Sequence, residues 1–192
     1  MSVTVPVEVS ARHIHLSQND LERLFGKKYK LRKLRPVSQP GLFAAKETVT
    51  ICGPRNCIEN VRIIGPARSH TQVEVSQTDA RILGLKPPVR VSGDLKGTPG
   101  CEVKGPKGAI KLNKGVIIAW RHLHCQPSFI KKYNLEKRKF VSVKINTANR
   151  SLTFHKVYLR VSPSYRTALH LDTDEGNAAG IKKKAKGIII EQ

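Results

Sequence analysis

Acidic and aromatic residues are scarce in this chain of 192 residues, which has 14 Asp and Glu against 35 Lys and Arg, with five Phe, four Tyr and one Trp. So few aromatic side chains argue against base stacking on an exposed aromatic platform. No run of about 18 apolar residues occurs, so we expect no membrane-spanning helix. The N-terminus enters strand-like alternation without an apolar signal segment, which predicts a cytoplasmic protein. Hydrophobic residues still make up 39% of the chain, enough for a packed core, so it is not a disordered basic tail.

The four cysteines are too few and too irregularly spaced for a disulfide framework, and none belongs to a C-x-x-C pair, so a zinc ribbon is unsupported. We expect Cys52, Cys57 and Cys101 to be buried or incidental thiols. Cys125 directly follows His124, and neighbours on a strand face opposite ways, which makes a poor nucleophile–base pair. The sequence also has no P-loop, no G-x-G-x-x-G turn and no G-x-S-x-G elbow, which excludes P-loop NTPases and Rossmann dehydrogenases.

The formal net charge of +21 predicts affinity for a polyanion such as RNA or DNA, with a Lys-rich solvated surface as the alternative. The cations are clustered, as phosphate-backbone contacts are, with six of them between residues 27 and 35 and another group near the C-terminus. The candidate RNA contacts are Lys27, Lys28, Lys30, Arg32, Lys33, Arg35, Lys182, Lys183, Lys184 and Lys186.

Short alternating or apolar runs separated by Gly, Pro, Asn and Asp recur along the chain and predict a mainly β fold, either barrels or a sandwich. The strand-like runs are 3–9, 47–52, 57–64, 72–75, 115–120, 140–145, 151–161 and 187–190. Two short helices are predicted as well. One covers residues 17–26, from the capping residue Ser17 to Gly26, and the other covers 77–83, before Gly84.

An internal repeat relates the two halves of the chain. Residues 10–17 (SARHIHLS) return as 119–126 (AWRHLHCQ), and 72–80 (QVEVSQTDA) align with 168–176 (ALHLDTDEG). In the second alignment Glu74 falls on His170. Each half therefore has one His-x-His and one further residue of a ligand type.

Each His-x-His can present two imidazoles to one ion, because side chains two residues apart on a strand share a face. With the repeat-matched residues this gives two sets, His13, His15 and Glu74 in one and His122, His124 and His170 in the other. Such His₂Glu and His₃ sets are the ligands of catalytic zinc that leave one coordination position open. A single His-x-His is explained as well by ordinary strand residues, but its duplication favours a metal role, with zinc as the leading ion and cobalt or iron as alternatives. His70 and His155 are then left as surface residues.

The turn Gly65-Pro66-Ala67-Arg68 precedes the segment that carries Glu74. An Arg offers a planar fork that matches phosphate oxygens, so a metal and Arg68 together suit an oxyanion such as inorganic phosphate. Taken alone, Arg68 would be one more surface cation.

In these motifs the chain resembles the phosphate propanoyltransferases, or phosphotransacylases, of the propanediol-utilisation (PduL) type, from Val5 to about Ile190. The segments that carry the resemblance are 9–17 (VSARHIHLS), 38–49 (SQPGLFAAKETV), 65–68 (GPAR), 92–95 (SGDL), 115–119 (GVIIA), 121–124 (RHLH) and 172–180 (DTDEGNAAG).

The resemblance implies a mainly β fold of two small antiparallel β-barrels with short capping helices, the first from residues 12–119 and the second from 2–11 with 120–190. It implies reversible transfer of a propanoyl or acetyl group between coenzyme A and inorganic phosphate at a two-metal site, usually zinc, held by the two ligand sets. The phosphate-contacting Arg of the family matches Arg68, and its coenzyme A contacts match Ser10, Arg62 and Asn177. Paired barrels could also present a surface for a homodimer.

Two hypotheses follow from the sequence. The first is a cytoplasmic phosphotransacylase, which the intact ligand sets and Arg68 favour. The second is a member of the same fold that serves as a basic RNA-binding or ribosome-associated protein, because a coenzyme A pocket needs only a few of the 35 cations.

Overall fold

The computed structural model describes residues 3–182 and 185–190, and it has the mainly β fold that the sequence predicts. The chain divides into two compact units. The first, Arg12–Ala119, is called here the sheet unit; the second, Met1–Ala11 with Trp120–Gln192, is called the barrel unit. Residue 2, Lys183 and Lys184, which belong to the predicted domains and RNA contacts, lie outside the described residues.

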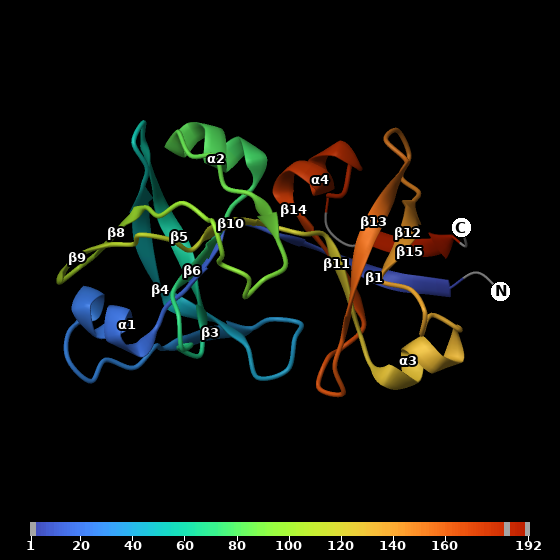
Figure 1. Cartoon of the computed structure of the whole chain (residues 1–192), viewed down its shortest axis with the longest axis horizontal. Helices are drawn as coiled ribbons and strands as arrows, with labels where there is room; N and C mark the ends of the chain where they lie inside the picture. Colours follow the sequence, from blue (N-terminus) through green and yellow to red (C-terminus); the bar gives the residue numbers. More distant parts are fainter. Residues whose placement is uncertain (1–2, 183–184, 191–192) are drawn as a thin grey trace. The chain divides into compact units, whose positions relative to one another are not determined.

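The barrel unit contains six strands, β1 (Val3–Ser10), β11 (His122–Cys125), β12 (Phe140–Ile145), β13 (Leu152–Val161), β14 (Ala168–Asp172) and β15 (Ala185–Ile190). They close into a barrel in the order β1, β14, β11, β13, β12, β15 (Figure 1). Closure pairs both edges of every strand, so the barrel leaves no strand edge open.

The sheet unit contains β2 (His13–His15), β3 (Lys33–Pro36), β4 (Phe43–Cys52), β5 (Cys57–Gly65), β6 (Gln72–Glu74), β7 (Val89–Arg90), β8 (Glu102–Gly105), β9 (Gly108–Lys111) and β10 (Val116–Ala119). They form a nine-stranded sheet in the order β7, β10, β6, β2, β5, β4, β8, β9, with β3 paired to β4 off this path. The exposed strand β3 carries Lys33, Arg35 and Pro36, residues that discourage another strand from pairing there.

Strand pairing is mixed in both units, whereas the resemblance implied antiparallel barrels. In the barrel unit β1 runs parallel to β14 and β11 runs parallel to β13. In the sheet unit β2 runs parallel to β5 and β10 runs parallel to β6. Parallel neighbours need long connections, and the helices and hairpins between these strands provide them.

Both predicted helices are present, as α1 (Gln18–Phe25) and α2 (Gln77–Leu83). The Ser17 side chain caps α1 by accepting from the Asp20 N–H, and Gly26 follows the helix at a φ of 109°. Ser76 and Asp79 form a capping box at the start of α2, and Gly84 ends it in the left-handed conformation. The short helices α3 (Pro127–Lys132) and α4 (Thr173–Ala178) were not predicted, because neither is long enough to show a helical period.

Each unit has its own apolar core. Ile14, Leu24 and Ile63 are fully buried in the sheet unit, and Leu123 and Leu169 in the barrel unit. No helix in the described part of the chain has the length and apolar character needed to cross a membrane.

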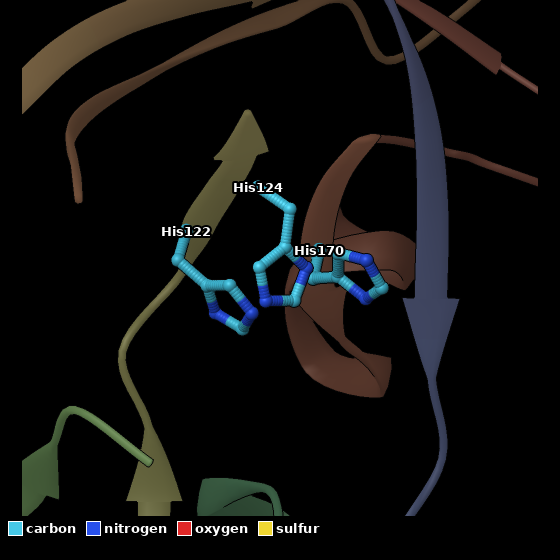
Figure 2. Close-up of side chains that lie close together, drawn as sticks. All are labelled: His122, His124 and His170. Atoms are coloured by element: carbon cyan, nitrogen blue, oxygen red, sulfur yellow. The ribbon is translucent and has the colours of Figure 1, made fainter. Parts of the chain in front are cut away.

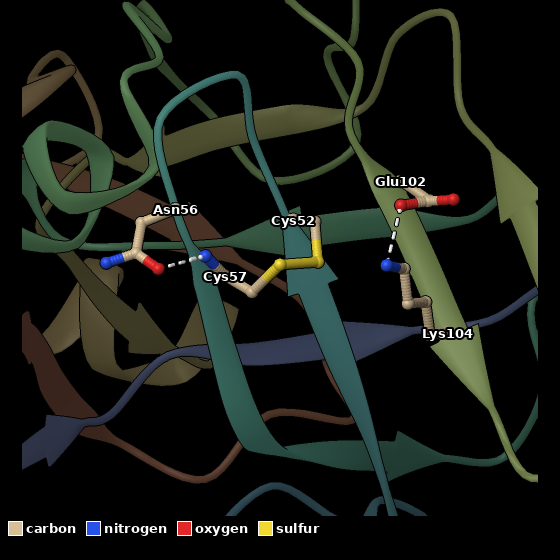
Figure 3. Close-up of a disulfide and its surroundings, with 5 residues drawn as sticks. All are labelled: Cys52, Asn56, Cys57, Glu102 and Lys104. Atoms are coloured by element: carbon tan, nitrogen blue, oxygen red, sulfur yellow. Dashed lines mark hydrogen bonds and ion pairs between the residues drawn. A yellow bond between two sulfur atoms is a disulfide. The ribbon is translucent and has the colours of Figure 1, made fainter.

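The prediction that Cys52 and Cys57 are incidental thiols is wrong, because the two residues form a disulfide (Figure 3). They end β4 and begin β5, and the hairpin register places them directly opposite each other. The Asn56 side chain accepts from the Cys57 N–H, and the Gly53 N–H donates to the Asn56 carbonyl, so the turn itself is well bonded. The spacing in sequence could not reveal this pairing, since it depends on the hairpin register.

Cys101 and Cys125 are free and buried. Burial raises the pKa of the Cys101 thiol to about 12 and that of Cys125 to about 11. Both are therefore protonated near neutral pH and are poor nucleophiles.

The disulfide closes a loop of only six residues, so its effect on the unfolded chain is modest. We expect the double variant Cys52→Ala/Cys57→Ala to lose about 2 kcal/mol of unfolding free energy, the value for closing so short a loop. Urea denaturation followed by circular dichroism measures this loss. Reducing agent should lower the stability of the wild type by a similar amount and leave the variant unchanged. Equal midpoints for the oxidised wild type and the variant would contradict the prediction.

Candidate functional site

Both predicted ligand sets are assembled, one in each unit. The ligand atoms of His13, His15 and Glu74 all lie within 4.8 Å of one another, and so do those of the second set, His122, His124 and His170. In each set the second His is buried and the other two residues are partly exposed. The first set thus offers two nitrogen donors and one oxygen donor, the second offers three nitrogen donors, and both have access to solvent.

Strand alternation builds the two imidazole pairs. The residue between the histidines, Ile14 in the sheet unit and Leu123 in the barrel unit, is fully buried in the apolar core. Because successive side chains on a strand point to opposite faces, burial of this central residue turns both histidines to the other face.

Cross-strand register brings in the third ligand. His13 is paired with Glu74 in the antiparallel strands β2 and β6, and His122 is paired with His170 in the antiparallel strands β11 and β14. The Nε2 atom of His13 lies 3.5 Å from Oε2 of Glu74. Directly opposed residues of an antiparallel pair are the nearest neighbours across the ladder, so the repeat in sequence becomes a repeat in space.

The three imidazoles of the barrel unit face one another (Figure 2). The rings of His122 and His170 are stacked, with centroids 5.1 Å apart, and the His124 ring meets both edge-on. Tyr165 packs against His124 from outside the set, with centroids 4.3 Å apart. Glu8 of β1 is also close, with its Oε2 atom 3.8 Å from Nε2 of His170.

Backbone carbonyls fix the orientation of one imidazole in each set. Nδ1 of His15 lies 3.0 Å from the Ile64 carbonyl oxygen, and Nδ1 of His122 lies 2.7 Å from that of Trp120. A carbonyl only accepts, so each neutral ring places its proton on Nδ1 and its lone pair on Nε2. This is the arrangement in which metal-binding histidines are usually held.

Two side chains that the sequence analysis did not assign hold the carboxylate of Glu74. Gln72 Nε2 donates to Glu74 Oε1 over 2.6 Å, and the Ser92 hydroxyl donates to the same oxygen over 2.9 Å. The Gln72 amide also accepts from the Gly93 N–H, which ties the 92–95 turn to β6. The only signals in the sequence were the SGDL segment and the position of Gln72 two residues before Glu74, on the same strand face.

The pKa of His15 is lowered to about 3, first because burial disfavours the charged ring and then because the charges of His13 and Arg68 repel it. Glu74 and the Ile64 carbonyl act in the opposite direction. His15 is therefore neutral at physiological pH, the form in which imidazole binds metals.

Arg68 lies beside the end of the first His-x-His strand. Its N–H donates to the carbonyl of Leu16, the residue after His15, and Arg68 forms a parallel bridge with Ser17. The positive charge of Arg68 is also one of the causes that lower the pKa of His15. The structure thus brings Arg68 and the set His13, His15 and Glu74 together in one unit.

The three predicted coenzyme A contacts do not all lie in one unit. Ser10 ends β1 and Asn177 lies in α4, both in the barrel unit. Arg62 belongs to β5 of the sheet unit, where its Nη1 donates to the Ala45 and Lys46 carbonyls over 3.0 and 2.8 Å. These carbonyls lie in β4 where its pairing with β5 is irregular, so the Arg62 side chain supports β4 at that point.

The described members of the basic clusters have exposed side chains, as expected, and so do His70 and His155. Arg32 is engaged within the sheet unit, because its Nε atom donates to the buried Glu47 over 2.7 Å. Tyr29 donates to the same carboxylate over 2.9 Å. Although Arg32 is exposed, it also serves as the counter-charge of a buried acid.

The comparisons with known proteins point in one direction. The family model of phosphate propanoyltransferase matches residues 6–182. A phosphate propanoyltransferase of Thermotoga maritima is 51% identical over 96% of this chain and 88% of its own length. Those of Clostridioides difficile and Salmonella typhimurium are 45% and 47% identical, over 98% and 92% of this chain and 90% and 83% of their own lengths.

The region matched by the family model includes both ligand sets, the GPAR turn and the capping residues of α4. Sequence identities of 45% to 51% over almost the whole chain are far above the level at which family membership is in doubt. These relatives give no support to an RNA-associated role. The resemblance identified from the sequence motifs is therefore confirmed, and the chain belongs to the phosphate propanoyltransferases, a family of acyltransferase enzymes.

Proposed function

We propose that this chain transfers a short acyl group, propanoyl or acetyl, reversibly between coenzyme A and inorganic phosphate. A phosphate oxygen bonds to the carbonyl carbon of the thioester to give a tetrahedral species, and the carbon–sulfur bond then breaks. The products are an acyl phosphate and the thiolate of coenzyme A, which takes up a proton. The observation that carries this proposal is the pair of ligand sets, with Arg68 beside one of them, in a member of this family.

We propose zinc as the ion, one in each set, with another divalent metal as the alternative. The fit rests on the donors themselves. Tetrahedral zinc with bonds of about 2.0 Å needs donors about 3.3 Å apart, and His13 Nε2 lies 3.5 Å from Glu74 Oε2. The neutral state of His15 suits the same chemistry. Bound zinc would act as a Lewis acid toward phosphate or carbonyl oxygen.

Arg68 has the role of binding and orienting phosphate for attack, because its planar fork matches two phosphate oxygens and neutralises their charge. It would also stabilise the negative charge that develops on oxygen as the tetrahedral species forms. No side chain needs to form a covalent intermediate, in keeping with the protonated state of Cys125. Ser10, Arg62 and Asn177 are the proposed coenzyme A contacts.

The location in the cytoplasm and the homodimer expected from the sequence stay predictions. The RNA-associated alternative rests on charge alone, and no feature of the ligand sets favours it. It becomes the better explanation only if the zinc-loaded protein shows no acyl transfer.

We expect Arg68→Ala and His122→Ala each to lower turnover by at least about a hundredfold, the usual effect of losing a main transition-state stabiliser. The assay is thioester formation from coenzyme A with acetyl phosphate or propanoyl phosphate, using purified protein supplemented with zinc. Arg81→Ala and His155→Ala are matched controls at exposed positions outside the ligand sets and should keep nearly full activity. Activity close to that of the wild type in Arg68→Ala or His122→Ala would remove that residue from the site.

We expect Ser92→Ala to weaken zinc binding at the set that contains Glu74 by about tenfold to a hundredfold, the range for losing a group that orients a metal ligand. Titration of the metal-free protein with zinc, in competition with a chromophoric chelator, measures both sites. The histidine set of the barrel unit is the internal control and should keep its affinity. Loss at both sites, or at neither, would contradict a local role for Ser92.

A further inference from the structure

An arginine immediately precedes each His-x-His, and in both units it pairs with a carboxylate at the start of the helix that follows the third ligand. Neither pair is needed to explain the ligand sets themselves. The two pairs have matching geometry in two units that are built differently.

In the sheet unit, Arg12 Nη1 lies 2.7 Å from Asp79 Oδ1. The other carboxylate oxygen of Asp79 accepts from the Ser76 N–H in the capping box of α2. The Asp79 side chain is only 4% exposed, whereas that of Arg12 is 42% exposed. Asp79 is thus rigidly placed at the helix start, and Arg12 reaches it from the end of the strand that carries His13.

In the barrel unit, Arg121 Nε lies 2.6 Å from Glu175 Oε1. Glu175 Oε2 accepts from the Asp172 N–H, and Asp172 in turn caps α4 by accepting from the Glu175 N–H. The carboxylate again belongs to a capping box, although it is a Glu where the other unit has an Asp.

The spacings are identical in the two halves. Each Arg directly precedes the first His of its set, and each carboxylate lies five residues after the third ligand, Glu74 or His170. The donor is Nη1 in Arg12 and Nε in Arg121, and the acid is Asp79 in one half and Glu175 in the other, but the ion pair connects the same two elements. It joins the strand with the His-x-His to the helix that begins just beyond the third ligand.

The position of the connection matters because of where the ligands lie on their strands. His13 begins β2 and Glu74 ends β6, so their pair is the last rung of a ladder of three residue pairs. His122 begins β11, and its pair with His170 is likewise the last rung between β11 and β14. The last residue pair of a ladder has a neighbouring residue pair on one side only, so it opens most easily. Each ion pair lies just beyond such a terminal residue pair.

We propose that Arg12 and Arg121 are positioning residues, each of which holds the first and third ligands of its set at the spacing that the metal needs. This inference rests on the proposed function in taking zinc as the occupant of the two sets. Without the ion pair the last rung opens, the third ligand moves relative to the first His, and the set loses affinity for zinc.

The variants Arg12→Ala and Arg121→Ala test this in the full chain. Metal-free protein is titrated with zinc against a chromophoric chelator, which gives the number of sites and their two dissociation constants without any substrate. We expect Arg12→Ala to weaken one site by about tenfold or more and leave the other unchanged. Arg121→Ala should weaken the other site, the double variant both, and Arg12→Lys should recover part of the loss.

Arg32→Ala is the matched control, since Arg32 also pairs with a buried carboxylate over 2.7 Å in the sheet unit, and neither Arg32 nor its partner Glu47 belongs to a strand that carries a ligand. It should lower stability to urea about as much as Arg12→Ala and leave both zinc constants within about twofold of the wild type. Should Arg12→Ala fail to fold, Asp79→Asn removes the charge while keeping an oxygen for the Ser76 N–H, and it should weaken the same site.

Zinc constants unchanged in folded Arg12→Ala or Asp79→Asn would overturn the proposal and reduce the ion pair to a support of the fold. Equal loss of zinc affinity in Arg12→Ala and Arg32→Ala would overturn it as well, since the effect would then be general destabilisation. Acyl transfer by the wild type is assayed separately. An inactive wild type with two intact zinc sites would therefore refute the proposed function and leave this inference standing.

Discussion

Burial of one apolar residue between two histidines is the constraint on which both candidate sites depend. Ile14 and Leu123 are fully buried. Because successive side chains of a strand point to opposite faces, the histidines on either side of each must point to the face away from the core. The gain from burying such a side chain is about 2 kcal/mol, so a slip of register by one residue, which would expose it and bury both imidazoles, is strongly disfavoured. The core thus fixes the face to which both imidazoles of each pair point.

The same order of strands surrounds both sets, although one sheet closes and the other does not. The order is β10, β6, β2, β5, β4 in the sheet unit and β1, β14, β11, β13, β12 in the barrel unit, with the same sequence of parallel and antiparallel pairs. In each half of the chain, the strand before the His-x-His strand belongs to one unit and the His-x-His strand belongs to the other. Strand β1 is in the barrel unit and β2 in the sheet unit, whereas β10 is in the sheet unit and β11 in the barrel unit. This exchange explains why the units divide at Ala11–Arg12 and at Ala119–Trp120.

The sequence was sufficient for the parts of the structure that are repeated or periodic. Duplication predicted which six side chains gather in the two clusters, and the capping residues predicted α1 and α2. What escaped it depends on register or on contacts between distant segments: the Cys52–Cys57 disulfide, the parallel pairs, and the support of Glu74 by Gln72 and Ser92. Arg62 shows the limit most clearly, because nothing in its local sequence indicates that its guanidinium binds the carbonyls of the neighbouring strand.

The two halves differ in where they place a negative charge. The third member is the carboxylate of Glu74 in one set and the imidazole of His170 in the other, so the histidine set has no carboxylate of its own. In the barrel unit, the strand next to the one that carries His170 supplies the missing carboxylate. In the sheet unit β10 places Ile117 opposite Glu74, whereas β1 of the barrel unit places Glu8 opposite His170, 3.8 Å from its ring. Each set therefore has one carboxylate beside its imidazoles, supplied from different strands. The sequence repeat alone shows the exchange of Glu for His, and only the strand order shows that the local charge balance is kept.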